Sequence, residues 1–429
     1  MNMQKHKEAV AVIGLGYVGL PLAALAVSKG YKVFGITHGK QKVQQINRGI
    51  NTLPDEPSIT PIIAQKKIIA TTSYDNIRKA DIVIVCVPTP VDHLYNPDLS
   101  PVISAAKGIL KCMKKGQLII IESTINPGVC EEVVLPILES TGKKVGKDFE
   151  LAHCPERIDP GSTKWNVRNI PRCVGSVTPK GAVRAAKFYR SILDGEVRVM
   201  KSIKEAEATK IIENTFRDIN IAYVNELAKS FDLLGIDLHD VIQGAANKPF
   251  AFMPHYPSVG VGGHCIAVDP YYLIERARQA GFDHKFLKLA REINNSMPAY
   301  TVGKLQDALN HTGKSVKGTP IGVLGLSYKA NVGDIRESPS LKVIELLEGL
   351  GAKVHIYDPY FPEKSTVKNL EAFLKAVEAI ILATNHREFL VIKPSQLKQA
   401  KVKVVIDGKN AWDKQALQKL GIIYKGIGR

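Results

Sequence analysis

Short apolar runs alternate with amphipathic stretches along the N-terminal half of the chain. Five runs have the length and composition of buried strands, and they lie at residues 9–13, 32–36, 81–87, 117–122 and 149–153. Helical patterns separate them, which is the order expected of a mainly parallel sheet with helices on both faces. Further strand-like runs follow near the C-terminus, at residues 320–326, 352–357, 377–383 and 402–406. We therefore predict an α/β fold with two Rossmann-like, doubly wound domains.

The region between these two sheets has a helical pattern. From Glu196 to Leu234 there is neither glycine nor proline, so most of this stretch is predicted to be one long helix that ends at Gly235. A second helical stretch, Asp283 to Asn310, contains Pro298, where we expect a bend. The patterns divide the chain into an N-terminal domain at 1–200, a central helical domain at 201–312 and a C-terminal domain at 313–429.

The first apolar run leads into a glycine-rich turn, Gly14-Leu-Gly16-Tyr-Val-Gly19, and a helical stretch and a second strand follow. In this order the first glycine makes the turn and the second admits a pyrophosphate. The third lets the helix pack on the strand with its N-terminus facing the phosphates. The same glycines alone are also compatible with an ordinary turn, but their context predicts a dinucleotide site.

The second strand ends without the acidic residue that usually holds the ribose of NAD. Thr37 stands there, and no acidic residue occurs between Glu8 and Asp55. Thr37 can hydrogen-bond a ribose, whereas nearby Lys40, Lys42 or Arg48 can meet the 2′-phosphate of NADP. The residues of this segment leave both cofactors open.

The composition is that of a globular protein, with 429 residues, 45% of them hydrophobic and 23% charged. No apolar run approaches the length of a membrane span, and the six cysteines lack CxxC spacing. The net charge is +17, but the lysines are dispersed and no nucleic-acid motif is present. A positive field of this kind would also attract a phosphorylated substrate. We expect a cytoplasmic protein with no metal site and neither nucleic acid nor membrane as a partner.

A second glycine-rich turn, Gly260-Val-Gly262-Gly-His-Cys265, presents a cysteine, and Asp269 follows four residues later. Glycines permit a positive φ and leave no side chains that would bar a bulky substrate. This arrangement favours a thiol that acts as a nucleophile. The alternative interpretation is a small buried cysteine in a tight turn.

Other polar positions lie where a site would form. Polar loops follow two of the predicted strands, at 123–128 and 154–157, and ligands of such sheets bind at the carboxyl ends of strands. On the long helix, spacings of three and four place one polar set on a single face: Glu207, Lys210, Asn214 and Arg217. That face is either solvated and salt-bridged or a stripe that holds a substrate. In the C-terminal domain, Ser338 is predicted to be an N-cap with Pro339 at the first helical position.

Together these segments resemble the UDP-glucose/GDP-mannose dehydrogenase family, in the family's order and over essentially the whole chain. The segments that carry the resemblance are Gly14–Leu20, Glu122–Thr124, His153–Arg157, Lys210 with Asn214, Gly260–Pro270, Tyr328–Lys329 and Asp334–Ser338. The variants at His153–Arg157 and Gly260–Pro270 are similar to the branch that acts on UDP-N-acetylhexosamines.

The resemblance implies an NAD-dependent, four-electron oxidation of carbon six of a UDP-sugar, best matched by UDP-N-acetyl-D-mannosamine. It implies a thiohemiacetal and then a thioester on Cys265, with Lys210 and Asn214 holding the oxygen at carbon six. Asp269 would support Lys210 and a water, and Glu156 would be the base for thioester hydrolysis. The C-terminal domain would bind the UDP-sugar, and the central domain would form a homodimer or a dimer-based oligomer.

The resemblance also implies two sets of binding residues. Those for the cofactor are Gly14, Gly16, Tyr17, Val18, Gly19, Thr37, Thr89, Thr124 and Arg336. Those for the substrate are Arg157, Ile158, Lys210, Asn214, Arg217, Gly262, Tyr328 and Lys329. Thr124 would also lie near the reacting end of the substrate and take part in catalysis.

The chain departs from the family pattern at two places. Thr37 replaces the acidic ribose partner, and the segment Lys248-Pro-Phe250 lacks the arginine that members of this branch give to the neighbouring subunit's substrate. Lys248 and His255 are candidates to replace it. UDP-N-acetylglucosamine, UDP-N-acetylgalactosamine and UDP-glucose therefore stay open as substrates.

Two other classes of protein explain part of the pattern. A two-electron dehydrogenase of the hydroxyacid type would share the first domain and the long helix but would not need Cys265. A redox-sensing regulatory protein would explain the dinucleotide motif and a reactive cysteine, but not Lys210, Asn214 and Glu156 together.

Overall fold

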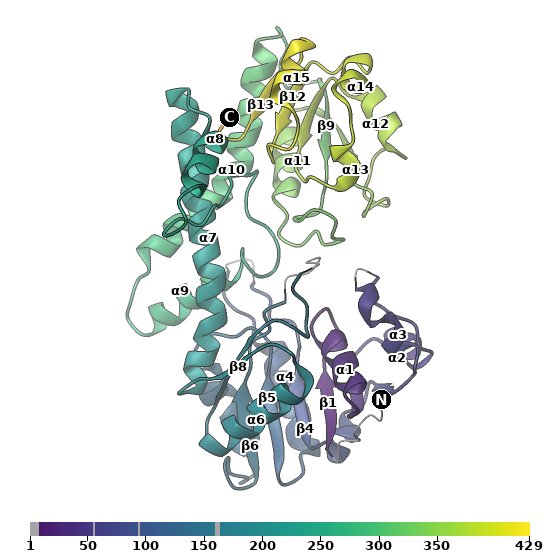
Figure 1. Cartoon of the computed structure of the whole chain (residues 1–429), viewed down its shortest axis with the longest axis vertical. Helices are drawn as coiled ribbons and strands as arrows, with labels where there is room; N and C mark the ends of the chain where they lie inside the picture. Colours follow the sequence, from purple (N-terminus) through teal and green to yellow (C-terminus); the bar gives the residue numbers. More distant parts are fainter. Residues whose placement is uncertain (1–7, 55, 93–94, 159–163) are drawn as a thin grey trace. The chain divides into compact units, whose positions relative to one another are not determined.

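The computed structural model describes residues 8–54, 56–92, 95–158 and 164–429. The chain forms two compact units, the first made of Met1–Glu213 with Tyr271–Phe282 and the second of Asn214–Pro270 with Asp283–Arg429 (Figure 1). Among the described helices, none has both the length and the apolar character that crossing a bilayer would require.

An eight-stranded sheet organises the first unit. Its strands are β1 (Ala9–Ile13), β2 (Lys32–Ile36), β3 (Ile68–Thr71), β4 (Ile82–Val85), β5 (Gln117–Ile121), β6 (Phe149–His153), β7 (Arg172–Ser176) and β8 (Val197–Val199). They lie in the order β3-β2-β1-β4-β5-β6-β7-β8. Neighbours are parallel except β6 and β7, which confirms the predicted mainly parallel sheet.

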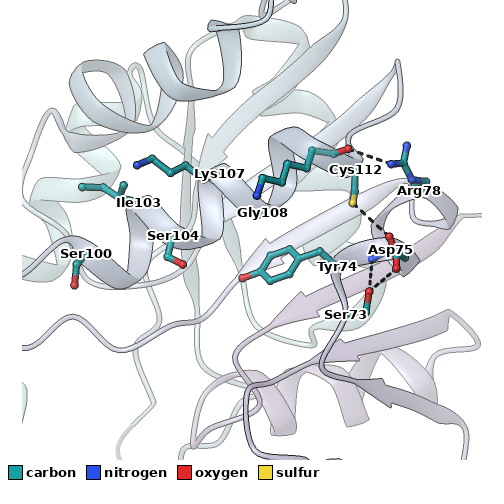
Figure 2. Close-up of a pocket in the computed structure, with 11 residues that line it drawn as sticks. Ser73, Tyr74, Asp75, Arg78, Ser100, Ile103, Ser104, Lys107, Gly108 and Cys112 are labelled. Atoms are coloured by element: carbon teal, nitrogen blue, oxygen red, sulfur yellow. Dashed lines mark hydrogen bonds between the residues drawn. The ribbon is translucent and has the colours of Figure 1, made fainter.

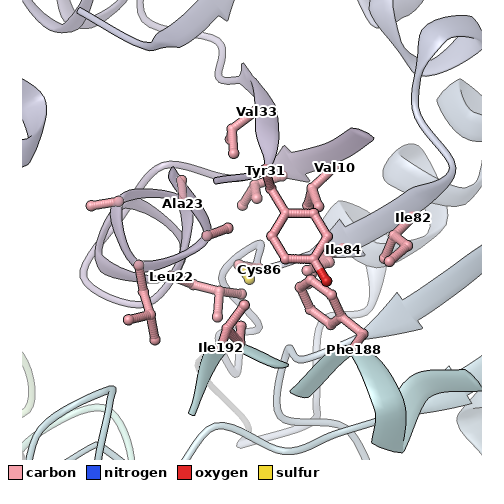
Figure 3. Packing of buried hydrophobic residues seen from close by; sticks show 14 of the residues in the cluster. Val10, Leu22, Ala23, Tyr31, Val33, Ile82, Ile84, Cys86, Phe188 and Ile192 are labelled. Atoms are coloured by element: carbon pink, nitrogen blue, oxygen red, sulfur yellow. The ribbon is translucent and has the colours of Figure 1, made fainter. Parts of the chain in front are cut away.

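Helices cover both faces of this sheet, which is why the central strands β1 and β4 are apolar throughout. On one face, α1 (Gly19–Ser28) and α6 (Pro179–Ile192) pack on the strands, and the rings of Tyr31 and Phe188 meet edge to face at 5.5 Å (Figure 3). The other face is covered by η2 (Tyr74–Lys79), α4 (Ser100–Cys112), η3 (Cys130–Val134) and α5 (Leu135–Glu139). The first unit also contains three short helices, which are α2 (Lys40–Asn47), η1 (Pro57–Ile59) and α3 (Thr60–Ile63).

A five-stranded parallel sheet organises the second unit. Its strands are β9 (Pro320–Leu324), β10 (Lys353–Tyr357), β11 (Ala379–Leu382), β12 (Val404–Asp407) and β13 (Ile423–Gly426), in the order β10-β9-β11-β12-β13. One face packs on α10 (Lys285–Asn310) and α11 (Pro339–Gly349). The other packs on α12 (Leu370–Ala376), α13 (Arg387–Leu390), α14 (Pro394–Gln399) and α15 (Lys414–Lys419). Two doubly wound α/β sheets are therefore confirmed.

Helices lie between the two sheets along the chain. They are α7 (Ile203–Leu234), which is 32 residues long, α8 (Leu238–Ala246) and α9 (Asp269–Gln279). The long helix ends before Gly235 as predicted, but it begins at Ile203 because Val197–Val199 pairs with β7. Ser338 is at the N-cap of α11 with Pro339 next to it, but its hydroxyl does not cap the helix and has no hydrogen-bond partner among the described residues.

Candidate active site

The glycines of the first turn have distinct structural roles. Gly14 has φ +92°, and a Cβ there would lie 2.3 Å from the backbone oxygen of Cys86. A Cβ on Gly19 would lie 1.9 Å from the oxygen of Gly14, so the helix can begin there only with glycine. A Cβ on Gly16, in contrast, would meet no atom within 4 Å beyond its chain neighbours. The unfilled space beside Gly16, before the N-terminus of α1, fits a pyrophosphate.

The predicted cofactor residues of the first unit gather at the carboxyl edge of its sheet. Thr37 follows β2 and donates its N–H to the Thr71 oxygen at 3.0 Å. Thr89 follows β4, is buried, and accepts a hydrogen bond from the Tyr272 hydroxyl at 2.6 Å. Thr124 follows β5. Because β2, β1, β4 and β5 are neighbours and parallel, their carboxyl ends bring these threonines to the same edge as the turn at Gly14–Gly19.

The loop after β6 carries Glu156, Arg157 and Ile158. The Glu156 carboxylate is buried and accepts a hydrogen bond from the backbone N–H of Ile158. Arg157 forms an ion pair with Glu213, with its Nε 3.1 Å from Oε2 of that residue. Glu213 is not predicted by the sequence pattern, because no local pattern links it to a residue 56 positions earlier.

On α7, Glu207 and Lys210 are both buried, so this part of the polar face is not a solvated one. The Glu207 carboxylate accepts backbone hydrogen bonds from Gly128 at 2.5 Å and from Cys130 at 2.9 Å. Burial raises the pKa of Glu207, and the two backbone hydrogen bonds oppose that effect. Glu207 thus ties the loop after β5 to the helix that carries Lys210.

In the second unit, Cys265 is exposed, whereas the other five cysteines are buried. The interpretation of Cys265 as a buried small residue is therefore wrong. The backbone N–H of Asp269 donates to the Cys265 oxygen at 2.8 Å, and α9 begins at Asp269. The Asn214 side chain donates to Oδ2 of Asp269 at 2.5 Å, so three predicted catalytic residues lie together.

The turn that carries Cys265 packs on a segment of the C-terminal domain. The Gly263 N–H donates to the Arg336 oxygen at 3.0 Å, and Cβ atoms on Gly262 or Gly263 would come within 2.8 Å of Tyr328 atoms. Only glycine permits this approach, since Gly263 also has φ +87°. The guanidinium of Arg336 pairs with Asp334 at 2.6 Å and is close enough to Cys265 to interact with it electrostatically. Arg336, which the resemblance assigns to the cofactor, is thus also a cation beside the Cys265 thiol.

The remaining predicted residues are more exposed. Arg217 is exposed on α7, and Lys329 is half-buried after β9. Lys248 is exposed, with its Nζ 4.7 Å from the ring centre of Phe250. The His255 ring lies 6.3 Å from that of Phe216.

A pocket of about 800 Å³ lies between η2 and α4 of the first unit (Figure 2). The ring of Tyr74 lies on Gly108, where a Cβ would come within 2.3 Å of it, and Arg78 donates to the Lys111 oxygen at 3.2 Å. None of the predicted site residues lines this pocket.

Three family models match the chain in sequence order. They describe the NAD binding domain (residues 8–193), the central domain (204–296) and the UDP binding domain (322–414) of the UDP-glucose/GDP-mannose dehydrogenase family. The chain is 36% identical over 425 residues to a UDP-N-acetyl-D-mannosamine dehydrogenase of Pyrococcus horikoshii, covering 98% of this chain and 99% of that protein. It is also 36% identical to a UDP-N-acetyl-D-glucosamine 6-dehydrogenase of Pseudomonas aeruginosa, over 89% of this chain and 91% of that one.

A solved structure agrees with this family assignment. The structure of a UDP-D-ManNAc dehydrogenase from Pyrococcus horikoshii superimposes with a TM-score of 0.91 at 36% identity and covers 98% of this chain and 99% of its own.

Proposed function

The chain belongs to the UDP-glucose/GDP-mannose dehydrogenase family, and we propose that it oxidises carbon six of a UDP-N-acetylhexosamine, with UDP-N-acetyl-D-mannosamine as the preferred substrate. The family assignment makes it an NAD-dependent oxidoreductase that acts on a nucleotide sugar. The observation that carries the proposal is the exposed Cys265, which lies beside Asn214 and Asp269 in a chain with NAD and UDP binding domains.

We propose that Cys265 is the nucleophile of a covalent route. NAD, when bound, accepts the hydride in each of the two oxidations. After the alcohol has become an aldehyde, the Cys265 thiolate adds to the aldehyde carbon to give a thiohemiacetal, whose oxidation gives a thioester. A neighbouring cation favours a thiolate, and Arg336 is the cation that the second unit provides.

Lys210 and Asn214 are proposed to hold the oxygen at carbon six while it carries negative charge. A buried cation is well suited to this role because it is not screened by water. Asp269 accepts a hydrogen bond from Asn214, which orients the Asn214 amide. Thr124 would contact the reacting end, and Arg157, Ile158, Arg217, Gly262, Tyr328 and Lys329 would line the sugar and UDP subsites.

Hydrolysis of the thioester is assigned to Glu156. Water attacks the carbonyl carbon, its proton passes to the Glu156 carboxylate, the new C–O bond forms, and the C–S bond breaks to release the Cys265 thiolate. No electrons leave the substrate in this step. The position of Glu156 in the loop after β6 supports the role, because ligands of such sheets bind at the carboxyl ends of the strands.

The wider organisation is also a proposal. The domain bounds 1–200, 201–312 and 313–429 remain our division of the chain, with dimerisation assigned to the central domain. Cytoplasmic location is consistent with six cysteines that are all free thiols. We propose the mannosamine epimer rather than the glucosamine or galactosamine epimer because of relatives named for UDP-N-acetyl-D-mannosamine. Other relatives are named for UDP-N-acetyl-D-glucosamine.

The test is a stoichiometry measurement with a small panel of UDP-sugars. We expect two NADH per uronic acid released, and the highest kcat/KM with UDP-N-acetyl-D-mannosamine. One NADH per sugar with an aldehyde or ketone as the product would instead identify a two-electron dehydrogenase. A higher kcat/KM with another panel member would move the assignment to that sugar.

A further inference from the structure

Arg172, the first residue of β7, is among the largest fully buried side chains of the protein. It lies between two carboxylates at the carboxyl edge of the sheet. Its Nη1 is 3.8 Å from Oε2 of Glu122, which follows β5, and its Nη2 is 3.9 Å from Oε1 of Glu156, which follows β6. The side chains of Arg172 and Glu122 are completely buried, and that of Glu156 is 10% exposed.

The guanidinium is held on one side only. Nη1 donates to the Pro155 oxygen at 3.3 Å, whereas Nε and Nη2 have no hydrogen-bond partner among the described residues. A buried charged donor without a partner is costly, so two opposite charges just outside hydrogen-bond distance are its natural partners. Nη2 is the donor nearest to Glu156, and a shift of less than 1 Å would complete that bond.

The neighbours of this cluster are nearly all acids or neutral groups. Burial opposes the charge on Arg172, but Glu122 and Glu156 together raise its pKa. Burial raises the pKa of Glu122, which Arg172 and a hydrogen bond from the Tyr189 hydroxyl counteract. Among the described residues, further titratable groups near this cluster are the thiols of Cys86 and Cys154, and burial raises the pKa of both. The guanidinium of Arg157 is also near, since it donates to the Pro171 oxygen at 3.1 Å, but it is paired with Glu213. Arg172 is therefore the buried cation that lies between the two carboxylates.

We propose that Arg172 is a positioning residue for thioester hydrolysis, which holds the Glu156 carboxylate ionised and oriented while Glu122 anchors the guanidinium from the other side. The inference rests on the proposed role of Glu156 as the base that receives the proton of water. A carboxylate can take that proton only in its ionised form, and burial without a cation favours the neutral form.

The proposal makes a specific kinetic prediction. Loss of the Arg172 charge leaves both hydride transfers possible but slows the release of the acid. In Arg172→Met, two equivalents of NADH per active site should form in a burst, followed by a steady rate lower by roughly a hundredfold, the usual size of a lost general base. The thioester should accumulate and be visible as added mass on the intact protein after acid quenching.

A pH profile separates this role from a merely structural one. The acidic limb of the pH profile of the steady-state rate should move to higher pH in Arg172→Met. It should move by less in Arg172→Lys, which keeps a positive charge but lacks the planar guanidinium whose nitrogens face both carboxylates. The matched control is Arg291→Lys, another buried arginine, whose Nη1 lies 2.6 Å from Asp218 in the second unit. That variant should lose stability without a burst and without a shifted limb.

Glu122→Gln keeps the test informative if Arg172→Met does not fold. It removes the anchor but leaves Arg172 in place, and a smaller shift of the same limb is expected. If Arg172→Lys and Glu122→Gln slow all steps equally and leave the limb in place, the inference is wrong. Glu156→Gln tells the two failures apart: a variant that still releases acid at the normal rate would remove Glu156 from the proposed mechanism itself.

Discussion

At the scale of single residues, exposure separates one cysteine from the rest. Burial raises the pKa of the thiols of Cys86, Cys130 and Cys154, whereas Cys265 is exposed beside Arg336. Thiolate character and access together decide which cysteine reacts. An alkylating reagent should therefore modify Cys265 first, as peptide mass mapping would show, and the modification should abolish acid formation.

Replacement of the same thiol gives the sharper result. Cys265→Ser keeps the size but gives a far weaker nucleophile, so we expect the production of acid to fall by several orders of magnitude while NAD binding survives. Cys112→Ser, at a buried cysteine of the Figure 2 pocket, is the control and should behave like the wild type. Acid formation by Cys265→Ser at the wild-type rate would rule out the covalent route.

Lys210 is buried on α7, and its proposed role is to stabilise charge that develops on the substrate oxygen. Lys210→Ala should lower kcat by about a hundredfold or more, as the loss of one oxyanion donor does. Lys229→Ala on the same helix removes a lysine that bonds Ser296 at 2.6 Å and should leave kcat nearly unchanged. An increase in KM alone for Lys210→Ala would assign this lysine to binding rather than chemistry.

Thr37 stands directly after β2, where an acidic residue would repel the 2′-phosphate of NADP. Without that repulsion we expect NAD to be used with weaker discrimination against NADP than an aspartate gives. Thr37→Asp should lower kcat/KM with NADP more than with NAD. Equal effects on the two cofactors would mean that residue 37 does not face the ribose.

At the scale of elements, the sequence predicted the strands in which apolar residues predominate and missed four others among the described residues. β3, β7, β8 and β13 are three to five residues long and include charged or polar residues, so their pattern does not stand out. The glycine turns were recognisable because the need for glycine at a position is local and steric. The polar loops were recognisable because they follow apolar runs directly. The contacts of Glu207 with Gly128 and of Arg172 with Glu122 join residues that only the folded sheet brings together.

The loop that carries Tyr328 and Lys329 is fixed by a carboxylate on the neighbouring strand. Asp358, directly after β10, accepts hydrogen bonds from the backbone of Leu326 at 2.6 Å and of Ser327 at 3.0 Å. Burial favours the neutral acid, but the hydrogen bonds from His386 and the backbone outweigh it and lower the pKa of Asp358 from 3.8 to about 2. The ionised carboxylate therefore stabilises the fold of the second unit.

The sign of the pH effect follows from that lowered pKa. The stabilisation is complete above the unfolded value of 3.8 and is lost as the pH falls through about 2. Asp358→Asn should lower the free energy of unfolding at pH 7 by about 1–3 kcal/mol and reduce its dependence on pH between 4 and 2. Asp307→Asn, at an exposed aspartate of α10, is the control. A variant with the wild-type pH dependence would show that Asp358 does not hold this loop.

At the scale of the whole molecule, the net charge of +17 would attract an anionic nucleotide sugar, but it does not explain a set of exposed apolar side chains in the second unit. These residues, which we call the central apolar surface, are Phe216, Tyr223, Phe250, Met253 and Tyr256, with exposures between 44% and 66%. Phe216 and Tyr223 are seven residues apart on α7 and therefore share a face. The contact of Phe216 with His255 brings the segment after α8 to the same place.

The proposed dimer would cover the central apolar surface with a second copy of the chain, which would remove from water the apolar area that these half-exposed side chains still present. A charge at the centre of such an interface is costly to desolvate, so the double variant Tyr223→Glu with Phe250→Glu should run as a monomer in size-exclusion chromatography with light scattering. Val183→Glu changes an equally exposed side chain on α6, 68% exposed, and should keep the wild-type mass. The monomer should also show a raised KM for the UDP-sugar at an unchanged affinity for NAD, because in the branch that the chain resembles the neighbouring subunit contributes a substrate-binding residue from the segment near Lys248. A wild-type protein that is already monomeric, or a double variant that keeps the wild-type mass, would remove the central apolar surface from the interface.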